Sequence, residues 1–577
     1  MKCVYLAGMK QPTKLRRYST IFTVFVGLFY TLFIGASCTA PDHSVDRRVF
    51  RYNQEGGISS LDPAFARDQA NIRAVAQLFS TLVSVDENLN VQPQLSTHWE
   101  IMDQGKLYRF FLRRDVLFHQ DPCFQGTSGR KLTAHDVVFS LRRLCEPSLA
   151  SPGAWIFQGK LAGDGFYAPN DSVFELRLIR PFPPILGMLG MAYCSIVAKE
   201  AVACYGQSMG IHPVGSGPFQ LAYYRPGDGL ILHKNPRYFE VENGKRLPWL
   251  EAVHIKFLAD KQSAFLAFLS GELEFLNGVE PAFRDELFLK NNELRSEYGE
   301  RFKVVRAPYL NTEYLGILND YQLKACHPAL QDPLVRKALS LAINREKLVR
   351  YLRGGIGIPA YGGLIPPGLP GSIDPSSKPI STYSTGSAQH DKKRTPSEAV
   401  EQARQILKGK GYINGSIRFT LATNPSYMDM AVFVQDQLAQ IGVVVDLEAS
   451  PGPTLRQMIN KGERGVFRGS WIADYPDAEN YLALGYSGYA APNGPNYTRF
   501  AHPQYDAWYE QALETTDEHL RYRLYERMDS MLLDETPFIV LYYDQTLRLE
   551  QKYVHGLPAH PLDLLDLRRV RYQNKTS

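Results

Sequence analysis

The chain has 577 residues, of which 44% are hydrophobic and 21% are charged, and its formal net charge is +5. A chain of this length is too long for one hydrophobic core, so we expect two or three domains. The positive charge comes from the first 37 residues, which hold five of the 64 basic residues and none of the 59 acidic ones. The rest of the chain is therefore neutral, and this balance argues against a nucleic-acid-binding protein.

The first 37 residues have the pattern of an export signal. A basic stretch precedes the apolar run Ile21–Ile34, whose 14 residues are short for a membrane span of about 20 and suit the core of a signal peptide. Small residues follow, and Cys38 then completes a stretch that resembles a bacterial lipobox. We expect removal of residues 1–37 and lipid attachment at Cys38. An ordinary signal peptide cleaved near Ser37 and a short anchor helix are the alternatives.

Cysteine and histidine usage indicates no metal site. Five of the seven cysteines lie beyond Cys38, and their spacing contains no CxxC pair. Export allows one disulfide, but the spacing does not select it. The 13 histidines form neither HxH nor HExxH, so we expect no zinc and no cofactor.

In chain order, predicted helices alternate with predicted strands, as in an α/β protein. Helix starts are predicted at Thr133 in "LTAHDVVFSLRRL", at Asp332 in "DPLVRKALSLAI" and at Thr395 in "TPSEAVEQARQIL", each with capping chemistry. Strands are predicted at 253–257, 443–448 and 538–543. The apolar positions of a C-terminal helix that we expect in the core are Leu520, Leu524, Met528, Met531 and Leu532. Residues 371–393, rich in serine and proline, are expected to form an exposed loop.

A secreted hydrolase is the rival function. "GQSMG", residues 206–210, puts Ser208 in the position of a GxSxG nucleophile. That motif needs a strand before the serine and a helix after it. Here "KEAVACY" before it predicts a helix, and "IHPVGSGPF" after it is incompatible with one. We therefore interpret the match as accidental and expect a protein that is not an enzyme.

Ten segments, in the same order along the chain, resemble the large extracytoplasmic solute-binding proteins of ABC importers, the peptide/nickel group. They include "SSLDPAFARDQANI", "LYRFFLRRDVLFH", "LTAHDVVFSLRR", "HPVGSGPFQL", "DPLVRKALSLAINREKLV" and "WIADYPDAENYL". The resemblance covers nearly all of the chain after the signal, and it is greatest for the oligopeptide-binding lipoproteins.

The resemblance implies an α/β fold of two lobes, the type II periplasmic-binding-protein fold, with an extra α/β subdomain in lobe I. By matching segments, lobe I comprises residues 38–79, 194–310 and 549–577. The inserted subdomain comprises residues 80–193, and lobe II comprises residues 311–548. Such a fold closes its lobes over a ligand, and closure contributes to binding only through contacts made in the closed state.

The stretch "RGSWIADYPD" carries the predicted ligand site. In oligopeptide-binding members the matching stretch also has arginine, tryptophan and aspartate at this spacing. The resemblance implies that Asp474 binds a peptide's α-ammonium, that Arg468 helps neutralise its α-carboxylate, and that Trp471 forms an apolar wall. Opposite charges at separate positions suit a short zwitterion. The alternative for Arg468 is an ion pair with a carboxylate of lobe II.

Two glycines, Gly215 and Gly217 in "GSGPF", are further candidates. We expect them to allow a tight turn or a close backbone approach at the cleft, or else a turn remote from any ligand.

The partners implied are a short peptide and the permease subunits of an ABC transporter. The protein would be a monomer outside the cytoplasm, held at a membrane by its lipid anchor. The alternative ligands are a murein peptide, haem or a nickel chelate.

Overall fold

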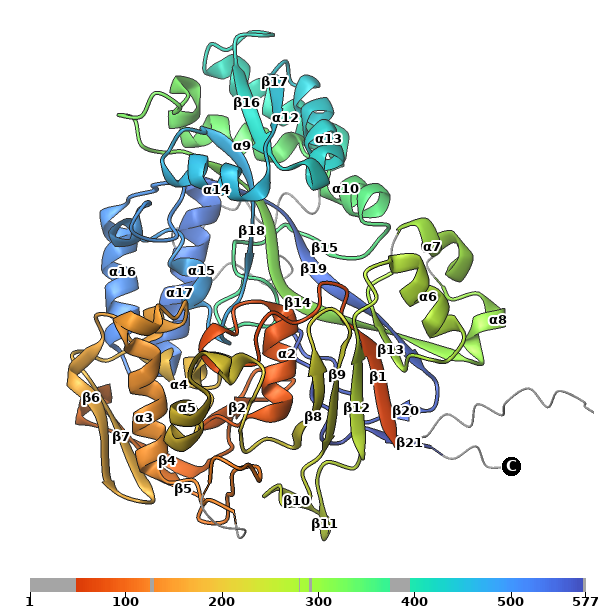
Figure 1. The fold of residues 1–577 in the computed structure, drawn as a ribbon. Coiled ribbons are helices and arrows are strands. Elements are labelled where there is room, and N and C mark those ends of the chain that lie inside the picture. The colour runs from red at the N-terminus through yellow and green to blue at the C-terminus, as the bar shows by residue number, and fades with distance from the viewer. Residues whose placement is uncertain (1–47, 125–128, 280, 290–292, 374–394, 574–577) are drawn as a thin grey trace, which may run out of the picture. The chain divides into compact units, whose positions relative to one another are not determined.

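The computed structural model describes residues 48–124, 129–279, 281–289, 293–373 and 395–573, all within one compact unit, Arg48–Ser577 (Figure 1). The predicted signal and Cys38 lie outside the described residues, as does most of the predicted loop at 371–393. Helices and strands alternate through the described chain, so the predicted α/β class is confirmed. Within these ranges, no helix has both the length and the apolar character needed to cross a membrane.

The largest sheet in the described chain has 11 strands. Ten of them follow one another in space as β17 (Val444–Ala449), β16 (Arg418–Thr423), β18 (Val466–Ile472), β14 (Phe302–Ile317), β19 (Phe538–Gln551), β13 (Phe275–Asn277), β1 (Val49–Asn53), β12 (Ala252–Lys256), β9 (Gly229–Lys234) and β8 (Phe219–Arg225). The short strand β15 (Ile358–Pro359) pairs with β19. All three strands predicted from the sequence are present, as β12, β17 and β19.

Two long strands join the halves of this sheet. β14 and β19 pair antiparallel from Phe302 opposite Gln551 to Gly316 opposite Phe538. At one end β19 pairs with β13, and at the other end β14 pairs with β18. The pairing of β14 with β19 is irregular between Pro308 and Thr312. The predicted lobe boundary at 310/311 falls inside this irregularity, and the division into lobes by residue number stays a prediction.

Three short two-stranded sheets and one four-stranded sheet complete the described strands. The four-stranded sheet runs β4 (Ser96–Met102), β5 (Leu107–Leu112), β7 (Val173–Leu178) and β6 (Leu161–Asn170), and lies wholly in the predicted subdomain. The short sheets pair β2 (Val83–Val85) with β3 (Val91–Pro93), β10 (Val241–Glu242) with β11 (Lys245–Arg246), and β20 (Val554–His555) with β21 (Arg571–Tyr572).

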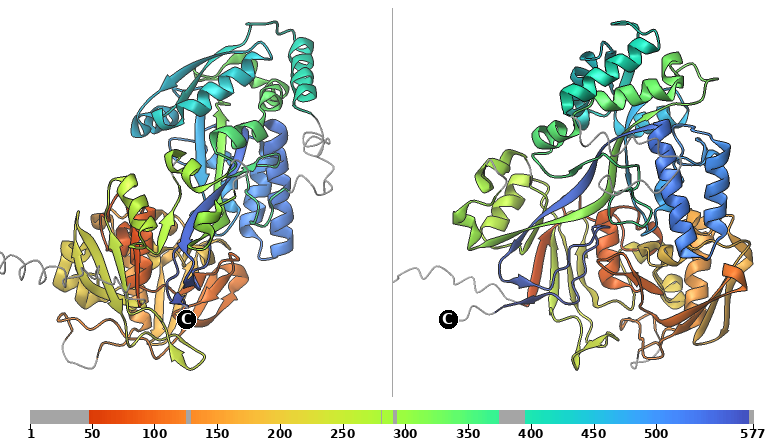
Figure 2. Two further views of the ribbon diagram at one scale, coloured as in Figure 1. Left: turned by 90° about the vertical axis from the view of Figure 1, so that its right-hand side faces the viewer. Right: turned by 180° about the vertical axis from the view of Figure 1, so that it is seen from behind.

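The helices pack around these sheets (Figure 1, Figure 2). Those in the first half are α2 (Gln69–Leu78), α3 (Ala134–Cys145), α4 (Ile185–Met188), α5 (Lys199–Tyr205), α6 (Lys261–Leu269), α7 (Pro281–Leu287) and α8 (Ser296–Gly299). Those in the second half are α9 (Pro333–Ala342), α10 (Arg345–Leu352), α12 (Pro396–Gly409), α13 (Met428–Ala439), α14 (Gly452–Asn460), α15 (Glu479–Leu482), α16 (Pro503–Glu514) and α17 (Glu518–Glu535).

The predicted helix starts are confirmed by their capping bonds. The backbone N–H of Thr133 donates to the Asp136 carboxylate at 2.8 Å, just before α3. Asp332 accepts a backbone N–H at 2.9 Å at the start of α9. Thr395 and Glu398 exchange two hydrogen bonds at the start of α12, at 2.8 and 3.3 Å. Each bond satisfies an amide that has no partner inside its own helix.

The predicted core positions are buried. In α17, Leu524, Met528, Met531 and Leu532 are buried and Leu520 is partly buried against the same core. Every residue of the predicted strand 538–543 is buried, because β14 pairs along one edge of β19 while cores cover its faces.

Candidate functional site

The arginine and the tryptophan of "RGSWIADYPD" lie on β18, and the aspartate follows it by two residues. β18 pairs antiparallel with β14, with Arg468 opposite Leu315 and Trp471 opposite Thr312. The stretch is therefore extended through Ile472, which keeps Arg468 and Asp474 apart along the chain.

One edge of β18 is unpaired over its second half. β16 pairs with β18 only at Val466 and Phe467, and no other described strand continues along that edge. Consecutive residues of an antiparallel strand direct their backbone groups to alternate sides. The N–H of Ala473 donates to the end of β14 at 2.8 Å, so the odd-numbered residues face β14. Ser470 and Ile472 therefore direct their N–H and C=O groups to the open edge.

Asp474 is reachable from solvent yet surrounded by protein. Asp474 is exposed to solvent, yet the protein around its carboxyl desolvates that group and raises its pKa above the ordinary value, while a hydrogen bond with Asn480 lowers the pKa. Burial and the nearby Asp474 charge also raise the pKa of Tyr193 to about 12, so the phenol of Tyr193 lies close by. Within the described chain Asp474 forms no ion pair. An accessible, desolvated and unpaired carboxylate is suited to receive a cation.

Asn480 organises this end of the site, and it was not predicted from the sequence. It is 5% exposed, and its Oδ1 accepts the indole N–H of Trp471 at 2.8 Å and the backbone N–H of Asp474 at 3.2 Å. Trp471 is half-buried against the main core, so its ring is held in place. Asn480 follows Trp471 by nine residues, beyond the turn into α15, and no spacing rule predicts that contact.

Arg468 is paired with a carboxylate in the second half of the chain. Its guanidinium makes two hydrogen bonds to Glu313 of β14, Nε to Oε1 and Nη2 to Oε2, the second at 2.6 Å. Its Cζ lies 3.4 Å from the centre of the Tyr427 ring. Burial raises the pKa of the Glu313 carboxyl to about 7, against the opposing effect of Arg468. The structure therefore has the alternative arrangement, an ion pair within the predicted lobe II.

A second arginine, Arg353, lies near this pair, and it was not among the site residues predicted from the sequence. Arg353 directly follows α10, and its Nη2 contacts Oδ1 of Asp544 at 2.8 Å. Its Nε is buried without a hydrogen-bond partner among the described residues. The charges of Arg353 and Asp544 both act on Glu313, so the two arginine–carboxylate pairs are neighbours. The basic end of the site thus holds Arg353 as well as Arg468.

Gly215 and Gly217 approach α2 rather than the groups described above. A Cβ on Gly215 would lie 2.0 Å from the carbonyl oxygen of Leu78. A Cβ on Gly217 would lie 2.4 Å from the carbonyl carbon of Leu78. The N–H of Gly217 donates to Leu78 at 2.9 Å, and the buried His119 contacts the Gly217 carbonyl at 3.1 Å. The close backbone approach is present, and it positions α2; among the described residues no hydrogen bond or ion pair joins these glycines to Asp474.

Ser208 does not have the setting of a catalytic nucleophile. Helix α5 precedes it, as expected, and "GQSMG" itself forms the 3₁₀ helix Gly206–Gly210, in which Ser208 is exposed and Met209 is buried. No group of three metal-ligating side chains occurs in the parts of the chain that the structure describes.

A solved structure shows which fold the chain has. "ABC transporter-associated periplasmic binding protein DppA from Helicobacter pylori in complex with peptide STSA" aligns with a TM-score of 0.69 and 24% identity, over 91% of this chain and 98% of that one. The fold is that of the type II periplasmic binding proteins, as predicted: two lobes with an extra α/β subdomain.

The family follows from the sequence match. Residues 90–493 match the model described as bacterial extracellular solute-binding proteins, family 5, and the chain belongs to this family. Among curated relatives, the "Probable deoxycholate-binding periplasmic protein YgiS" of Escherichia coli (strain K12) is 28% identical over 89% of this chain and 91% of its own length. The "Peptide transport periplasmic protein SapA" of Salmonella typhimurium (strain LT2) is 25% identical over 91% of this chain and 93% of its own length.

Proposed function

We propose that this protein is the substrate-binding component of an ABC importer that captures short peptides outside the cytoplasm and delivers them to the permease. Membership of the solute-binding family supports the class, and the printed functions of SapA and of the peptide-bound DppA support the ligand. The observation that carries the proposal is the unpaired carboxylate of Asp474 beside an unpaired strand edge.

The peptide backbone would add to the open edge of β18. Ser470 and Ile472 offer N–H and C=O groups there, and main-chain pairing of this kind gives affinity without dependence on side-chain identity. The α-ammonium of the peptide would then pair with Asp474, two residues past the strand. Trp471, held by Asn480, would form an apolar wall beside it.

The peptide carboxylate would meet the basic end of the site. Arg468 already makes two hydrogen bonds to Glu313, so its positive charge would attract the peptide carboxylate only in part. Arg353 holds Asp544 through one nitrogen and keeps a buried Nε without a hydrogen-bond acceptor among the described residues. A ligand carboxylate at Arg353 would satisfy that donor, and a guanidinium is well matched to a carboxylate.

The protein would bind and release its ligand unchanged. Ser208 lacks the strand–serine–helix setting of a nucleophile, and a carrier needs a closable cleft rather than a reactive group. Asp474 and Asp477 are close in sequence, but Asp477 accepts the Tyr525 hydroxyl at 2.9 Å, which supports a structural role for Asp477.

Export and anchoring complete the proposal. The basic stretch, the short apolar run and the small residues before Cys38 support signal removal and lipid attachment there. The protein would then act as a monomer tethered outside the cytoplasm, where it meets peptides and the permease.

The experiment is to denature the purified protein, identify any co-purified small molecule by mass spectrometry, and titrate the emptied protein with short peptides by calorimetry. We expect free peptides to bind and to be recovered intact, and N-acetylated peptides to bind at least tenfold more weakly, because acetylation removes the charge that Asp474 would receive. A haem, a metal chelate or a bile acid as the co-purified molecule, with no peptide binding, would contradict the proposal.

A further inference from the structure

The fold places Cys123 near Cys204, although the two are 81 residues apart in sequence. Cys123 follows β5 in the predicted subdomain 80–193, and Cys204 is on α5 in predicted lobe I. Both are free thiols in the structure, as are the three other cysteines of the described ranges. The spacing of the cysteines selects no pair, so the contacts around these two residues decide whether they can be joined.

The segment that holds Cys123 is attached to α5 on one side by Asp121. Oδ1 of Asp121 accepts the backbone N–H of Cys123 at 2.8 Å and the hydroxyl of Tyr205 at 2.7 Å. Tyr205 is the residue next to Cys204. One carboxylate oxygen therefore connects the backbone of Cys123 to the immediate neighbour of Cys204.

The same segment is attached to α5 a second time, on the other side of Cys123 in sequence. Nε of Arg130 contacts Oε1 of Glu200 at 3.2 Å. Glu200 and Cys204 are four residues apart on α5, so they lie on the same face of the helix. Cys123 thus lies between two attachments that end one turn before Cys204 and one residue after it.

The two thiols differ in accessibility. Cys204 is exposed, whereas Cys123 is half-buried. Burial and a hydrogen bond to Asp121 raise the pKa of the Cys123 thiol to about 12. Smaller contributions to this pKa come from Cys204 and Glu200, so both α5 residues lie close to the Cys123 sulfur. Cys204 is therefore the sulfur that reacts first, and Cys123 is a protected thiol beside it.

The three other described cysteines are poorly placed to react in the folded protein. Cys145 and Cys194 are neighbours, but burial raises the pKa of both thiols, to about 11 for Cys145, and Cys194 is only 1% exposed. Cys326 is buried and donates to the carbonyl of Leu318 at 3.3 Å. Among the described cysteines, Cys204 thus has the one exposed thiol from which disulfide exchange can start.

We propose that Cys123 and Cys204 form a disulfide once the protein is exported to a compartment where disulfides persist. The oxidant is a disulfide-bonded donor, either a thiol oxidoreductase or glutathione disulfide. The Cys204 thiolate attacks the donor disulfide, and one donor sulfur leaves as a thiolate. Asp121 accepts the proton of the Cys123 thiol, whose sulfur attacks Sγ of Cys204 and releases the second donor sulfur. The protein loses two electrons and two protons, and the donor gains them as two thiols.

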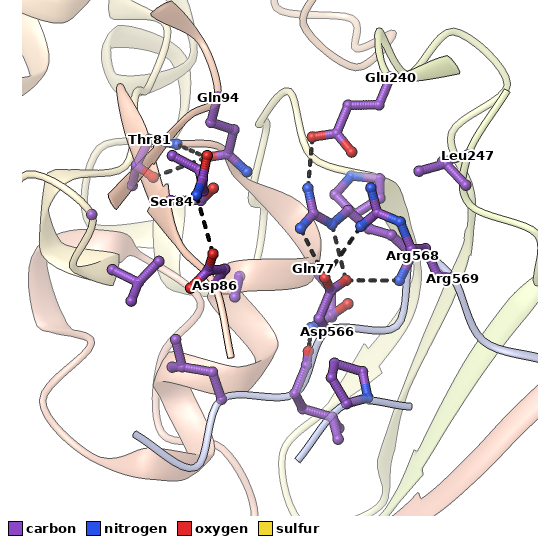
Figure 3. Close-up of a pocket in the computed structure, with 18 of the residues that line it drawn as sticks. Gln77, Thr81, Ser84, Asp86, Gln94, Glu240, Leu247, Asp566, Arg568 and Arg569 are labelled. Atoms are coloured by element: carbon purple, nitrogen blue, oxygen red, sulfur yellow. Dashed lines mark hydrogen bonds and ion pairs between the residues drawn. The ribbon is translucent and has the colours of Figure 1, made fainter. Parts of the chain in front are cut away.

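The bond ties the predicted subdomain to lobe I. It involves no residue of the predicted lobe II at 311–548, so it leaves closure of the lobes free. It also leaves open a cavity of about 1050 Å³ in the same half, which includes Gln77, Glu240 and Arg568 (Figure 3). No residue from 116–131 or 199–212 lines that cavity. The disulfide therefore stabilises the fold without obstructing either place.

The test is peptide mapping of the mature protein, alkylated and then digested with trypsin without reductant. Trypsin places each of the five described cysteines in a separate peptide, with Cys123 in 115–130 and Cys204 in 200–234. We expect these two peptides as one linked species that is absent from Cys204→Ser. Cys326→Ser is the control, because its hydroxyl can still donate to the Leu318 carbonyl, and it should keep the link. Treating reduced, folded protein with glutathione disulfide should form the same link.

Thermal unfolding measures the effect of the bond. The oxidised wild type should unfold about 2–4 °C above the reduced protein, whereas Cys204→Ser should unfold at one temperature with or without reductant. Free thiols at both positions in the exported protein or after glutathione disulfide treatment, or a link from either cysteine to another partner, would overturn the inference. If the signal is retained, the proposed export fails, while a link formed by glutathione disulfide still supports this pair.

Discussion

Replacing Asp474 by alanine removes the group that we propose receives the peptide's α-ammonium. The carboxylate is already desolvated by the surrounding protein and has no cationic partner among the described residues. When a peptide ammonium occupies this position and water leaves, removing the carboxylate leaves the ammonium buried without a partner. The cost is roughly 3–5 kcal/mol. Affinity for a free peptide should therefore fall about a hundredfold or more, since each ~1.4 kcal/mol is tenfold.

The assay is calorimetric titration of wild type and Asp474→Ala with one peptide in free and N-acetylated forms. Only the combination of wild type and free peptide should bind tightly. Equal affinities in all four combinations would refute the reasoning and leave Asp474 a structural residue.

Protonation of Asp474 should have the same effect as its removal. Because the pKa of Asp474 is raised, peptide affinity should begin to fall at a higher pH than for an ordinary aspartate. The sign for stability is opposite: a raised pKa in the folded state means that the ionised carboxylate is unfavourable at neutral pH. Asp474→Ala should therefore unfold at the same urea concentration as wild type or at a slightly higher one, and a clear decrease would contradict this account.

Three further perturbations test the fold and the anchor. Gly217→Ala should destabilise the protein by about 2–3 kcal/mol in urea unfolding, because the new Cβ would lie 2.4 Å from the Leu78 carbonyl carbon; unchanged stability would show that α2 can move away. Burial raises the pKa of Asp529 to about 7, so wild type should lose up to about 4 kcal/mol of stability as pH rises from 4 to 7, whereas Asp529→Asn should show a flatter profile. Parallel pH profiles would contradict that pKa. Cys38→Ser should release the folded protein from the membrane fraction, and unchanged fractionation and processing would remove the lipobox interpretation.

Local chemistry was predictable from the sequence. The caps at Thr133, Asp332 and Thr395 involve groups within three residues of one another, so spacing alone predicts their bonds. The alternating apolar residues of β12 likewise predict a strand with one buried set of side chains.

Contacts across the fold were not predictable. Glu313 and Arg468 are 155 residues apart, and only the pairing of β14 with β18 brings them together. Arg353 was not predicted as a site residue, because its partner Asp544 is 191 residues away in sequence. The glycines of "GSGPF" signalled a close backbone approach, but the sequence did not identify α2 as the element approached. Hydrogen bonds between residues close in sequence can be predicted from residue spacing. Contacts between residues far apart in sequence depend on how the strands and helices are arranged in the fold.

The strand order of the large sheet also determines when the protein can fold. β1, at the start of the described chain, lies between β12 and β13, and β13 in turn pairs with β19, whose strand begins only at Phe538. Arg73 and Arg548 also form buried ion pairs with Asp563, so α2, near the start of the described chain, depends on a residue near the C-terminus. Pairings between such distant segments are slow to form. A chain that leaves the ribosome or a membrane pore from its N-terminus therefore exposes β1 without its neighbours until almost the whole chain has emerged. Its early strands depend on protection from aggregation during that interval.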